Sequence, residues 1–250
     1  MTVALPHLFP DHTVPDVLVS GISLDSRQTQ PGELFVALPG ETSDGRWFIQ
    51  DALDNGACAI VSPTPLDSIA PEVPLIVIPE IKSSLGRIAG IFYGMPSEQL
   101  RVAAVTGTNG KTSVTFLAAN AMSYLSHQAG IIGTLGAGVI GELEATGLTT
   151  PDAVTFQASL SNLAKADVEV AFVEASSHGL SQFRLEGTRI GAAVLTNLTR
   201  DHLDYHGSLS AYRQAKARLF EWPGLEVAIL SFDDPWALEV SRETSAAEVI

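Results

Sequence analysis

The sequence VAAVTGTNGKT, residues 102–112, decides the fold class of this chain. An apolar run leads into a glycine-rich turn, and the turn leads into a predicted helix over 112–125. Gly107 and Gly110 let the backbone turn sharply and approach phosphate groups, while the helix N-terminus offers N–H donors and the positive end of its dipole. The order strand, Gly-x-x-Gly-Lys-Thr and helix therefore predicts a phosphate-binding loop.

Two side chains of this loop carry chemistry. Lys111 can reach the β- and γ-phosphates of a nucleotide, and the Thr112 hydroxyl can ligate Mg²⁺. The general pattern has glycine where this chain has Val105, so the loop is a shortened variant. A glycine turn that merely caps a helix is the weaker interpretation, because strand, motif and helix coincide. The predicted nucleotide-binding residues are Gly107, Thr108, Asn109, Gly110, Lys111 and Thr112.

Strands and helices alternate regularly around the loop. Their pattern predicts a mostly parallel, doubly wound α/β sheet, which binds its ligands at the carboxyl ends of the strands. Residues 247–250 resemble the start of a further strand, so the sheet is expected to be incomplete. The predicted strands are 100–105, 130–132, 168–173, 192–195 and 227–231, and the further helices are 152–164 and 210–220.

The first part of the chain has the pattern of a smaller α/β unit. Short apolar runs at 34–38, 58–61 and 75–78 predict strands. A helix over 47–55 is expected to end at Gly56, and a helix over 82–93 at the Gly-Met-Pro-Ser sequence that follows. We therefore predict a small N-terminal domain over residues 1–95 and a second domain over 96–250.

Composition excludes several classes of protein. Hydrophobic residues make up 46% of the chain, which argues against disorder, and the net charge of −14 argues against a nucleic-acid-binding surface. The one cysteine, Cys58, allows neither an intramolecular disulfide nor a site of several thiolates. No signal peptide and no apolar run of about 20 residues is found. A cytoplasmic monomer without membrane insertion is expected.

Several further segments are similar to one known family. They are TTP at 149–151, EASSHGLSQFR at 174–184, TNLTRDHLDYHG at 196–207 with Tyr212 and Lys216 after it, and, near the start, LDSR at 24–27, GELFVAL at 32–38 and DGR at 44–46. With the GTNGKT loop, these segments resemble the Mur ligases, most closely the MurE group, from about residue 21 to about residue 234. The related folylpolyglutamate synthetase shares this form of loop.

The resemblance implies an ATP-dependent amide ligase. Such a ligase adds the third amino acid, meso-diaminopimelate or L-lysine, to UDP-MurNAc-L-Ala-D-Glu through an acyl phosphate, using ATP and Mg²⁺. Residues 1–95 would bind the UDP-sugar, and residues 96–250 would form an incomplete ATP-binding domain. The resemblance implies that these 250 residues do not include the family's C-terminal domain, which selects the amino acid, so both amino acids remain open and this chain alone is expected to ligate poorly.

The resemblance also implies roles for residues beyond the loop. Glu174 follows a predicted strand and resembles the family's magnesium-binding glutamate, although a solvated strand-end carboxylate is the plainer interpretation. His202 matches a ligand of a second Mg²⁺, with Asp201 as a supporting carboxylate. Lys216 matches a lysine that the family carbamylates; from the residues alone it would be an exposed helical lysine. The implied catalytic residues are Lys111, His202 and Lys216, and the implied metal ligands are Thr112, Glu174, His202 and Lys216 as N-carboxylysine.

Six residues resemble the family's contacts to the nucleotide sugar and peptide. Ser26 matches a serine that contacts the uridine part, and Arg184 has the planar fork that binds carboxylate or diphosphate oxygens in pairs. Caps of helices and turns are the alternative roles for the Ser and Thr residues. The implied substrate residues are Ser26, Thr149, Thr150, Ser176, Gln182 and Arg184.

Three other functions compete with this one. A sibling such as folylpolyglutamate synthetase is disfavoured by the segments at 176–178 and 201–206. A non-catalytic fragment that still binds the nucleotide sugar is compatible with every motif. A generic phosphate-loop switch is the weakest, because it leaves the first domain and every motif after Thr112 unexplained.

Overall fold

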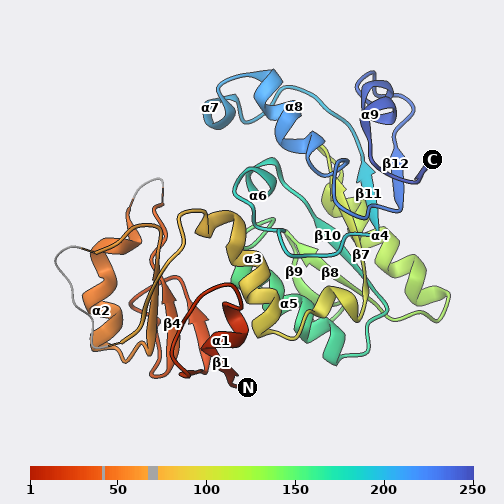
Figure 1. Ribbon diagram of the computed structural model, residues 1–250. Helices are drawn as coiled ribbons and strands as arrows, with labels where there is room; N and C mark the ends of the chain where they lie inside the picture. The colour runs from red at the N-terminus through yellow and green to blue at the C-terminus, as the bar shows by residue number, and fades with distance from the viewer. Residues whose placement is uncertain (41–42, 67–72) are drawn as a thin grey trace. The chain divides into compact units, whose positions relative to one another are not determined.

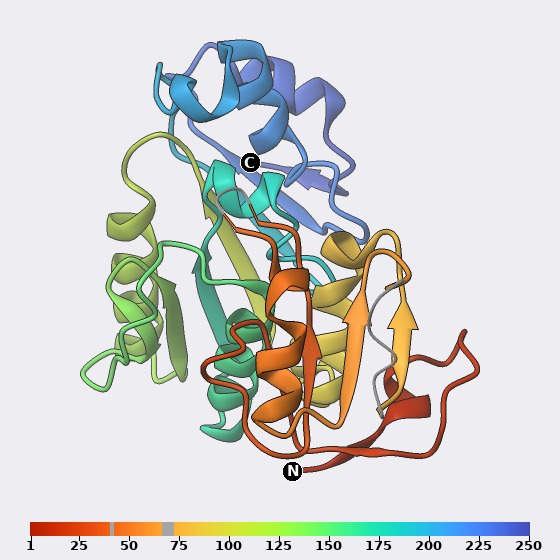
Figure 2. The same cartoon turned by 90° about the vertical axis from the view of Figure 1, so that its left-hand side faces the viewer.

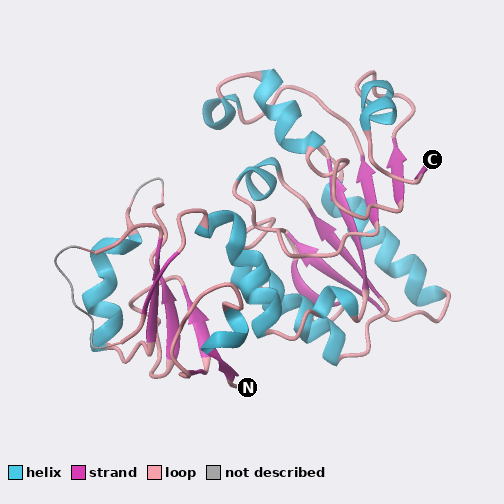
Figure 3. Cartoon of the chain, in the orientation of Figure 1, coloured by secondary structure: helices cyan, strands magenta, loops and turns pink. Residues whose placement is uncertain are grey.

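The computed structural model describes residues 1–40, 43–66 and 73–250. The chain divides into two compact units, Met1–Gly94 and Met95–Ile250, and this division lies next to the boundary expected at residue 95. Each unit combines helices with a parallel sheet, which confirms the predicted fold class (Figure 3). Within the described ranges, none of the helices has the length and apolar composition needed to cross a membrane.

The first unit is built on a four-stranded sheet of order β3-β4-β5-β6. All of its neighbouring strands are parallel (Figure 2). A short antiparallel pair, β1 and β2, precedes it. The elements are β1 Val3–Ala4, α1 Leu5–Leu8, β2 Leu18–Val19, β3 Gly21–Ser23, β4 Glu33–Val36, the 3₁₀ turn Gly45–Phe48, α2 Ile49–Asp54, β5 Ala59–Ser62, β6 Leu75–Val77 and α3 Ile81–Phe92.

Helix α2 shows how local chemistry shifts a predicted boundary. The apolar spacing predicts a helix over 47–55, but the segment begins as a 3₁₀ turn and becomes α-helical only at Ile49. Asp44 causes the early start, because its carboxylate accepts the Arg46 N–H at 3.0 Å. Ile49 then packs with Phe35 and Ile60 in the core of this unit. The helix ends before Gly56, which has φ +91°, the left-handed conformation expected there.

The second unit is built on a seven-stranded sheet of order β13-β12-β11-β7-β10-β8-β9. Only the last pair, β8 and β9, is antiparallel. The elements are the 3₁₀ turn Pro96–Glu98, β7 Arg101–Thr106, α4 Lys111–Tyr124, β8 Ala129–Gly133, β9 Gly136–Val139, α5 Ala153–Lys165, β10 Val170–Glu174, α6 Ser177–Ser181, β11 Ala192–Leu195, α7 Leu203–His206, α8 Leu209–Ala217, β12 Val227–Leu230, α9 Ala237–Glu243 and β13 Glu248–Val249.

Helices pack on both faces of this sheet, with α4 on one side and α5 on the other (Figure 1). Strand β10 shows the alternation that this requires. Val173 joins a large core with Phe156 of α5, whereas Phe172 packs toward Ala119 of α4. In register, Glu174 lies beside Val105 at the end of β7. The carboxyl ends of the central strands therefore meet at one edge, where sheets of this type bind their ligands.

Candidate active site

The glycine turn after β7 is braced from the neighbouring segment at 196–199. The Thr196 hydroxyl donates to the Asn109 carbonyl at 2.6 Å, and the Asn197 amide pairs with the backbone of Asn109 on both its N–H and C=O sides. The Thr108 hydroxyl accepts the Thr199 N–H at 2.9 Å and lies 3.1 Å from the Tyr212 hydroxyl. These contacts fix the backbone conformation of the loop.

Gly107 is required by this close packing. Its φ is +144°, and a Cβ added there would lie 1.9 Å from the Thr196 Oγ1 atom and 3.0 Å from the Asn197 carbonyl oxygen. We expect Gly107→Ala to lower the free energy of unfolding by about 2–4 kcal/mol, from backbone strain plus overpacking. Thermal and urea unfolding measure this. The control is Gly141→Ala, whose φ is +102° with no atom within 4 Å; an equal loss in both variants would show that packing plays no part.

Lys111 and Thr112 begin helix α4 directly after the turn. The Lys111 ammonium donates to the Gly107 and Thr108 carbonyls, both at 3.0 Å, so the cation lies over the loop. Burial lowers the pKa of Lys111, and the charges of Glu174 and Asp201 oppose that shift. A cation held above backbone donors at a helix N-terminus is suited to the phosphates of a nucleotide.

Glu174 ends strand β10 and is 2% exposed. Its Oε2 atom accepts the Thr112 hydroxyl at 3.0 Å, and its Oε1 atom accepts the Thr134 N–H at 2.8 Å. Because the Thr112 hydroxyl proton is directed at the carboxylate, the lone pairs of its oxygen stay available. A hydroxyl oxygen beside a carboxylate is the hard-donor set that Mg²⁺ prefers, so these two residues fit a magnesium ion.

Lys216 is 1% exposed, which excludes the surface position that its residue type suggests. Its ammonium donates to the Gly107 carbonyl at 2.8 Å and lies 4.7 Å from the centre of the Tyr212 ring. Burial, and after it the charge of Lys111, lower the pKa of Lys216 to about 7, while the charge of Asp201 opposes the shift. This lysine is therefore partly neutral near pH 7 and can act as a nucleophile.

His202 lies in a cluster of rings at the outer side of the loop. The His202 ring is 6.3 Å from the Tyr212 ring and 4.8 Å from the His178 ring, and its side chain is 48% exposed. Asp201 accepts the His202 N–H at 2.9 Å. Across the described ranges, His, Cys, Asp and Glu side chains form no group of three or more able to hold a metal ion.

The predicted substrate turn is tied to the end of β10. Thr150 is 1% exposed; its hydroxyl donates to the Glu174 carbonyl at 2.6 Å and accepts the Ser176 N–H at 3.0 Å. The Ser176 hydroxyl accepts the Gly179 N–H at 3.0 Å and so caps helix α6. Thr149 is less buried, and its hydroxyl lies 3.0 Å from that of Thr134. Thr150 and Ser176 thus have structural contacts at positions predicted for substrate.

Gln182 and Arg184 belong to the same network. Arg184 donates to the Thr150 carbonyl at 2.5 Å and, through two nitrogens, to the Gln182 side-chain oxygen at 3.0 and 2.5 Å. The Gln182 amide donates to the Tyr205 hydroxyl at 3.1 Å. The structure therefore brings together Thr149, Thr150, Ser176, Gln182, Arg184 and Glu174 at the carboxyl edge of the sheet.

Ser26 lies in the first unit and is 4% exposed. It lines a cavity of about 550 Å³ whose apolar part includes Phe35 and Phe48. Asp25 and Arg27 also border this cavity and pair at 2.7 Å, and the hydrogen bond from Arg27 lowers the pKa of Asp25 to about 2. A flat ring with polar edges would fit such a cavity.

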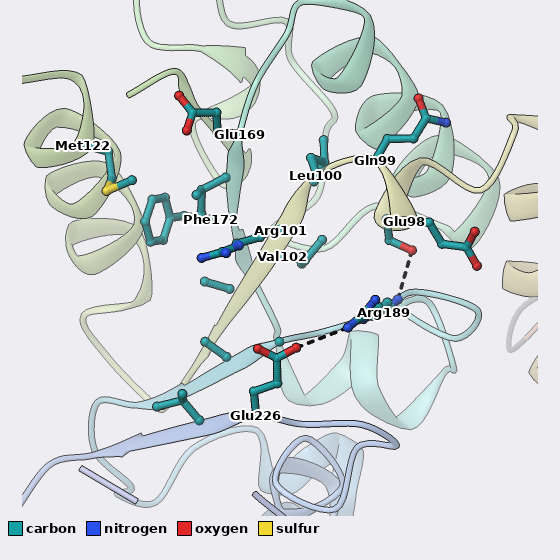
Figure 4. Close-up of a pocket in the computed structure, with 16 residues that line it drawn as sticks. Glu98, Gln99, Leu100, Arg101, Val102, Met122, Glu169, Phe172, Arg189 and Glu226 are labelled. Atoms are coloured by element: carbon teal, nitrogen blue, oxygen red, sulfur yellow. Dashed lines mark hydrogen bonds and ion pairs between the residues drawn. The ribbon is translucent and has the colours of Figure 1, made fainter. Parts of the chain in front are cut away.

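A cavity of about 630 Å³ lies at the opposite edge of the large sheet, at the amino ends of β7, β10, β11 and β12 (Figure 4). Arg189 borders it, paired with Glu226 at 3.3 Å, and the Arg189 N–H donates to the Ser97 hydroxyl at 3.0 Å. None of the catalytic, nucleotide-binding, substrate or metal residues predicted from the sequence lines this cavity. The phosphate loop and Glu174 lie at the other end of these strands.

The sequence did not predict three residues that shape the site: Thr134, Thr196 and Tyr205. Thr196 and Tyr205 belong to a quoted motif, but nothing in their pattern indicates a contact with the loop or with Gln182. Thr134 directly follows strand β8, as Gly107 follows β7, and that position was the signal that could have found it.

The chain is similar to known proteins along most of its length. Residues 105–250 match the Mur ligase middle domain, and residues 18–93 match the Mur ligase family catalytic domain. The UDP-N-acetylmuramoyl-L-alanyl-D-glutamate–2,6-diaminopimelate ligase of Pseudomonas putida is 46% identical over 97% of this chain and 49% of its own length. A solved structure of an enzyme of that name is 37% identical, with a TM-score of 0.86 over all of this chain and 52% of that one.

A more distant likeness shows the fold alone. The folylpolyglutamate synthase of Mycobacterium tuberculosis is 22% identical over 65% of this chain and 45% of its own chain, with a TM-score of 0.52. The present chain spans about half the length of the curated relatives it matches. Together, the two matched family regions cover most of the 250 residues. The chain belongs to the Mur ligase family.

Proposed function

We propose that this chain forms the nucleotide-sugar-binding and ATP-binding parts of an ATP-dependent amide ligase. The ligase would add the third amino acid to UDP-MurNAc-L-Ala-D-Glu during peptidoglycan precursor synthesis. The relatives' names favour meso-diaminopimelate over L-lysine as that amino acid. One observation carries the proposal: Lys111, Thr112, Glu174 and the buried Lys216 converge on one glycine turn at the carboxyl edge of the sheet.

Each residue then has a defined task. Lys111 and the N–H groups of the turn would bind the phosphates, while Thr112 and Glu174 would hold one Mg²⁺. Lys216, as its carbamate, and His202 would hold a second. When bound, ATP would supply the phosphoryl group that activates the substrate carboxylate as an acyl phosphate, with magnesium neutralising the crowded anions.

Each unit separately contains residues suited to one part of the nucleotide sugar. The cavity at Ser26 fits the uracil ring, because it combines the apolar faces of Phe35 and Phe48 with polar groups at its border. Arg184, fixed by Gln182 and the Thr150 carbonyl, would present a cation to a carboxylate or diphosphate. Thr149 is less buried than Thr150, so it is the better candidate of the two threonines for direct contact with substrate.

Calorimetric titration with UDP-MurNAc-dipeptide tests the proposal, with UDP-glucose as the control ligand. We expect selective binding of the dipeptide form, because the threonine turn, and Arg184 through a peptide carboxylate, would contact groups that UDP-glucose lacks. Ser26→Ala should weaken both ligands equally, since it affects the shared uridine part. Equal affinity of the unmodified chain for the two ligands, or binding of neither by a folded chain, would contradict the proposed substrate.

A second candidate is a fragment that binds the nucleotide sugar without ligating it. A ligation assay with ATP, the dipeptide substrate and meso-diaminopimelate separates the two functions. Product formation would support the ligase, and selective binding without product would support the fragment.

A further inference from the structure

The carboxylate of Glu174 is held from the end of the neighbouring strand β8. Thr134, the residue after β8, donates twice: its N–H to Oε1 at 2.8 Å and its hydroxyl to Oε2 at 3.2 Å. Thr112 donates to Oε2 from the other side at 3.0 Å. The orientation of the carboxylate is therefore set by two segments, one of which lies outside the phosphate loop.

Gly133 makes room for this arrangement. Strands β8 and β10 are parallel, with Ile132 beside Val173, so the next residues, Gly133 and Glu174, lie side by side. A Cβ at Gly133 would lie 2.2 Å from the Oε1 atom of Glu174. At the end of β8, Gly133 leaves space for the Glu174 carboxylate, and Thr134 donates two hydrogen bonds to it.

The Thr134 hydroxyl also contacts the predicted substrate turn. It lies 3.0 Å from the Thr149 hydroxyl. A hydroxyl has one proton, and that of Thr134 points to Glu174, so Thr134 accepts the proton of Thr149. This order leaves the lone pairs of the Thr149 oxygen free to accept from a ligand. Thr134 therefore connects Thr149 of the predicted substrate turn to the Glu174 carboxylate by hydrogen bonds.

We propose that Thr134 is a positioning residue that fixes the Glu174 carboxylate for magnesium and connects it to Thr149. The inference rests on the proposed function, in which Glu174 ligates the ion. A carboxylate whose rotamer is locked by hydrogen bonds binds a metal more tightly than one that must be ordered on binding. Removal of the Thr134 hydroxyl leaves its N–H bond to Oε1 intact, so the side-chain contribution can be measured separately.

The test uses Thr134→Val, which keeps the shape and removes the hydroxyl, and Thr134→Ser, which keeps the hydroxyl. ADP binding is titrated by calorimetry at a series of Mg²⁺ concentrations, and Mn²⁺ binding is followed directly by electron paramagnetic resonance. We expect Thr134→Val to raise the metal concentration for half-saturation roughly tenfold to 100-fold, the range typical for loss of a hydrogen bond that orients a metal ligand. Thr134→Ser should restore the wild-type value. Thermal unfolding of each variant confirms that it is folded.

Thr146→Val is the matched control, because the Thr146 hydroxyl donates to the Leu148 carbonyl in the same loop region. It should leave the metal dependence unchanged. Unaltered metal binding in Thr134→Val, or equal weakening in Thr134→Ser, would overturn the positioning role. Glu174→Gln tests the proposed function separately from the role of Thr134. If this variant shows the same metal dependence as the wild type, Glu174 is not a metal ligand and the proposed function is wrong at that point.

Discussion

Replacing Lys111 by alanine should weaken the binding of ADP to this chain by more than about 100-fold, the loss expected when a partly buried cation no longer meets its phosphate. Without Lys111, the phosphates would approach the carboxylates of Glu174 and Asp201 with less positive charge to offset them. The Lys111 ammonium donates to two loop carbonyls, so its removal should leave the strand and helix around it in place.

Calorimetry measures this loss, and circular dichroism shows whether the fold is retained. Lys165→Ala is the control, because Lys165 is an exposed lysine in the last turn of α5 and its removal changes the net charge by the same amount. Its affinity for ADP should equal that of the wild type. Near-normal binding of ADP by Lys111→Ala would contradict this prediction. It would mean either that the glycine turn binds phosphate without this lysine or that ADP binds somewhere other than the glycine turn.

The large sheet could be predicted from the sequence because its signals are local. The turn at 107–110 combines a preceding apolar strand with a following helix, and both elements form within one residue of the predicted limits. Strand β10 was placed less well: it begins at Val170, not at 168. Asp167 has φ +56°, and the Val168 N–H still bonds to Leu163, so these residues complete the exit from helix α5. The end of the helix depends on the left-handed conformation of Asp167, and the pattern of apolar residues does not predict that conformation.

Helix α8 shows a different limit. Its predicted end at residue 220 is wrong, because the helix stops at Ala217 and the next residues form tighter turns, with the Phe220 N–H bonded to the Ala217 carbonyl. Tyr212 and Lys216 are one turn apart and both buried, so the inner face of this helix carries a lysine. A pattern of apolar residues cannot identify such a face, because lysine counts as polar in it. The resemblance to a family, not the pattern, singled out Lys216.

Thr134 shows why a site cannot be completed from motifs. A threonine after a strand has no distinctive neighbours in the sequence, and its partner Glu174 lies 40 residues away. Only the parallel pairing of β8 with β10 brings the two together. Sequence motifs identify Lys111, Thr112 and Glu174. Thr134, which orients Glu174, is identified only by the pairing of β8 with β10 in the structure.

Lys216 should take up CO₂ from bicarbonate buffer as a carbamate, and the uptake should rise as the pH rises through about 7. The neutral amine attacks the carbon of CO₂ and loses a proton, which yields an N-carboxylate and one H⁺. A lysine with the ordinary pKa of about 10.4 is neutral in fewer than one molecule in 1,000 at pH 7, whereas a pKa of about 7 makes about half of Lys216 neutral there.

¹³C NMR of the chain in ¹³C-bicarbonate measures the carbamate, which should be more abundant at pH 8 than at pH 6. The resonance should disappear in Lys216→Arg and persist in Lys165→Ala, and its survival in Lys216→Arg would assign it to another amine. Lys111→Ala should weaken it. The charge of Lys111 helps to lower the pKa of Lys216, and once Lys216 is an anion the same charge stabilises it. One cation would thus prepare its neighbour for carboxylation and then hold the product, which makes the two lysines that donate to the Gly107 carbonyl a single electrostatic unit.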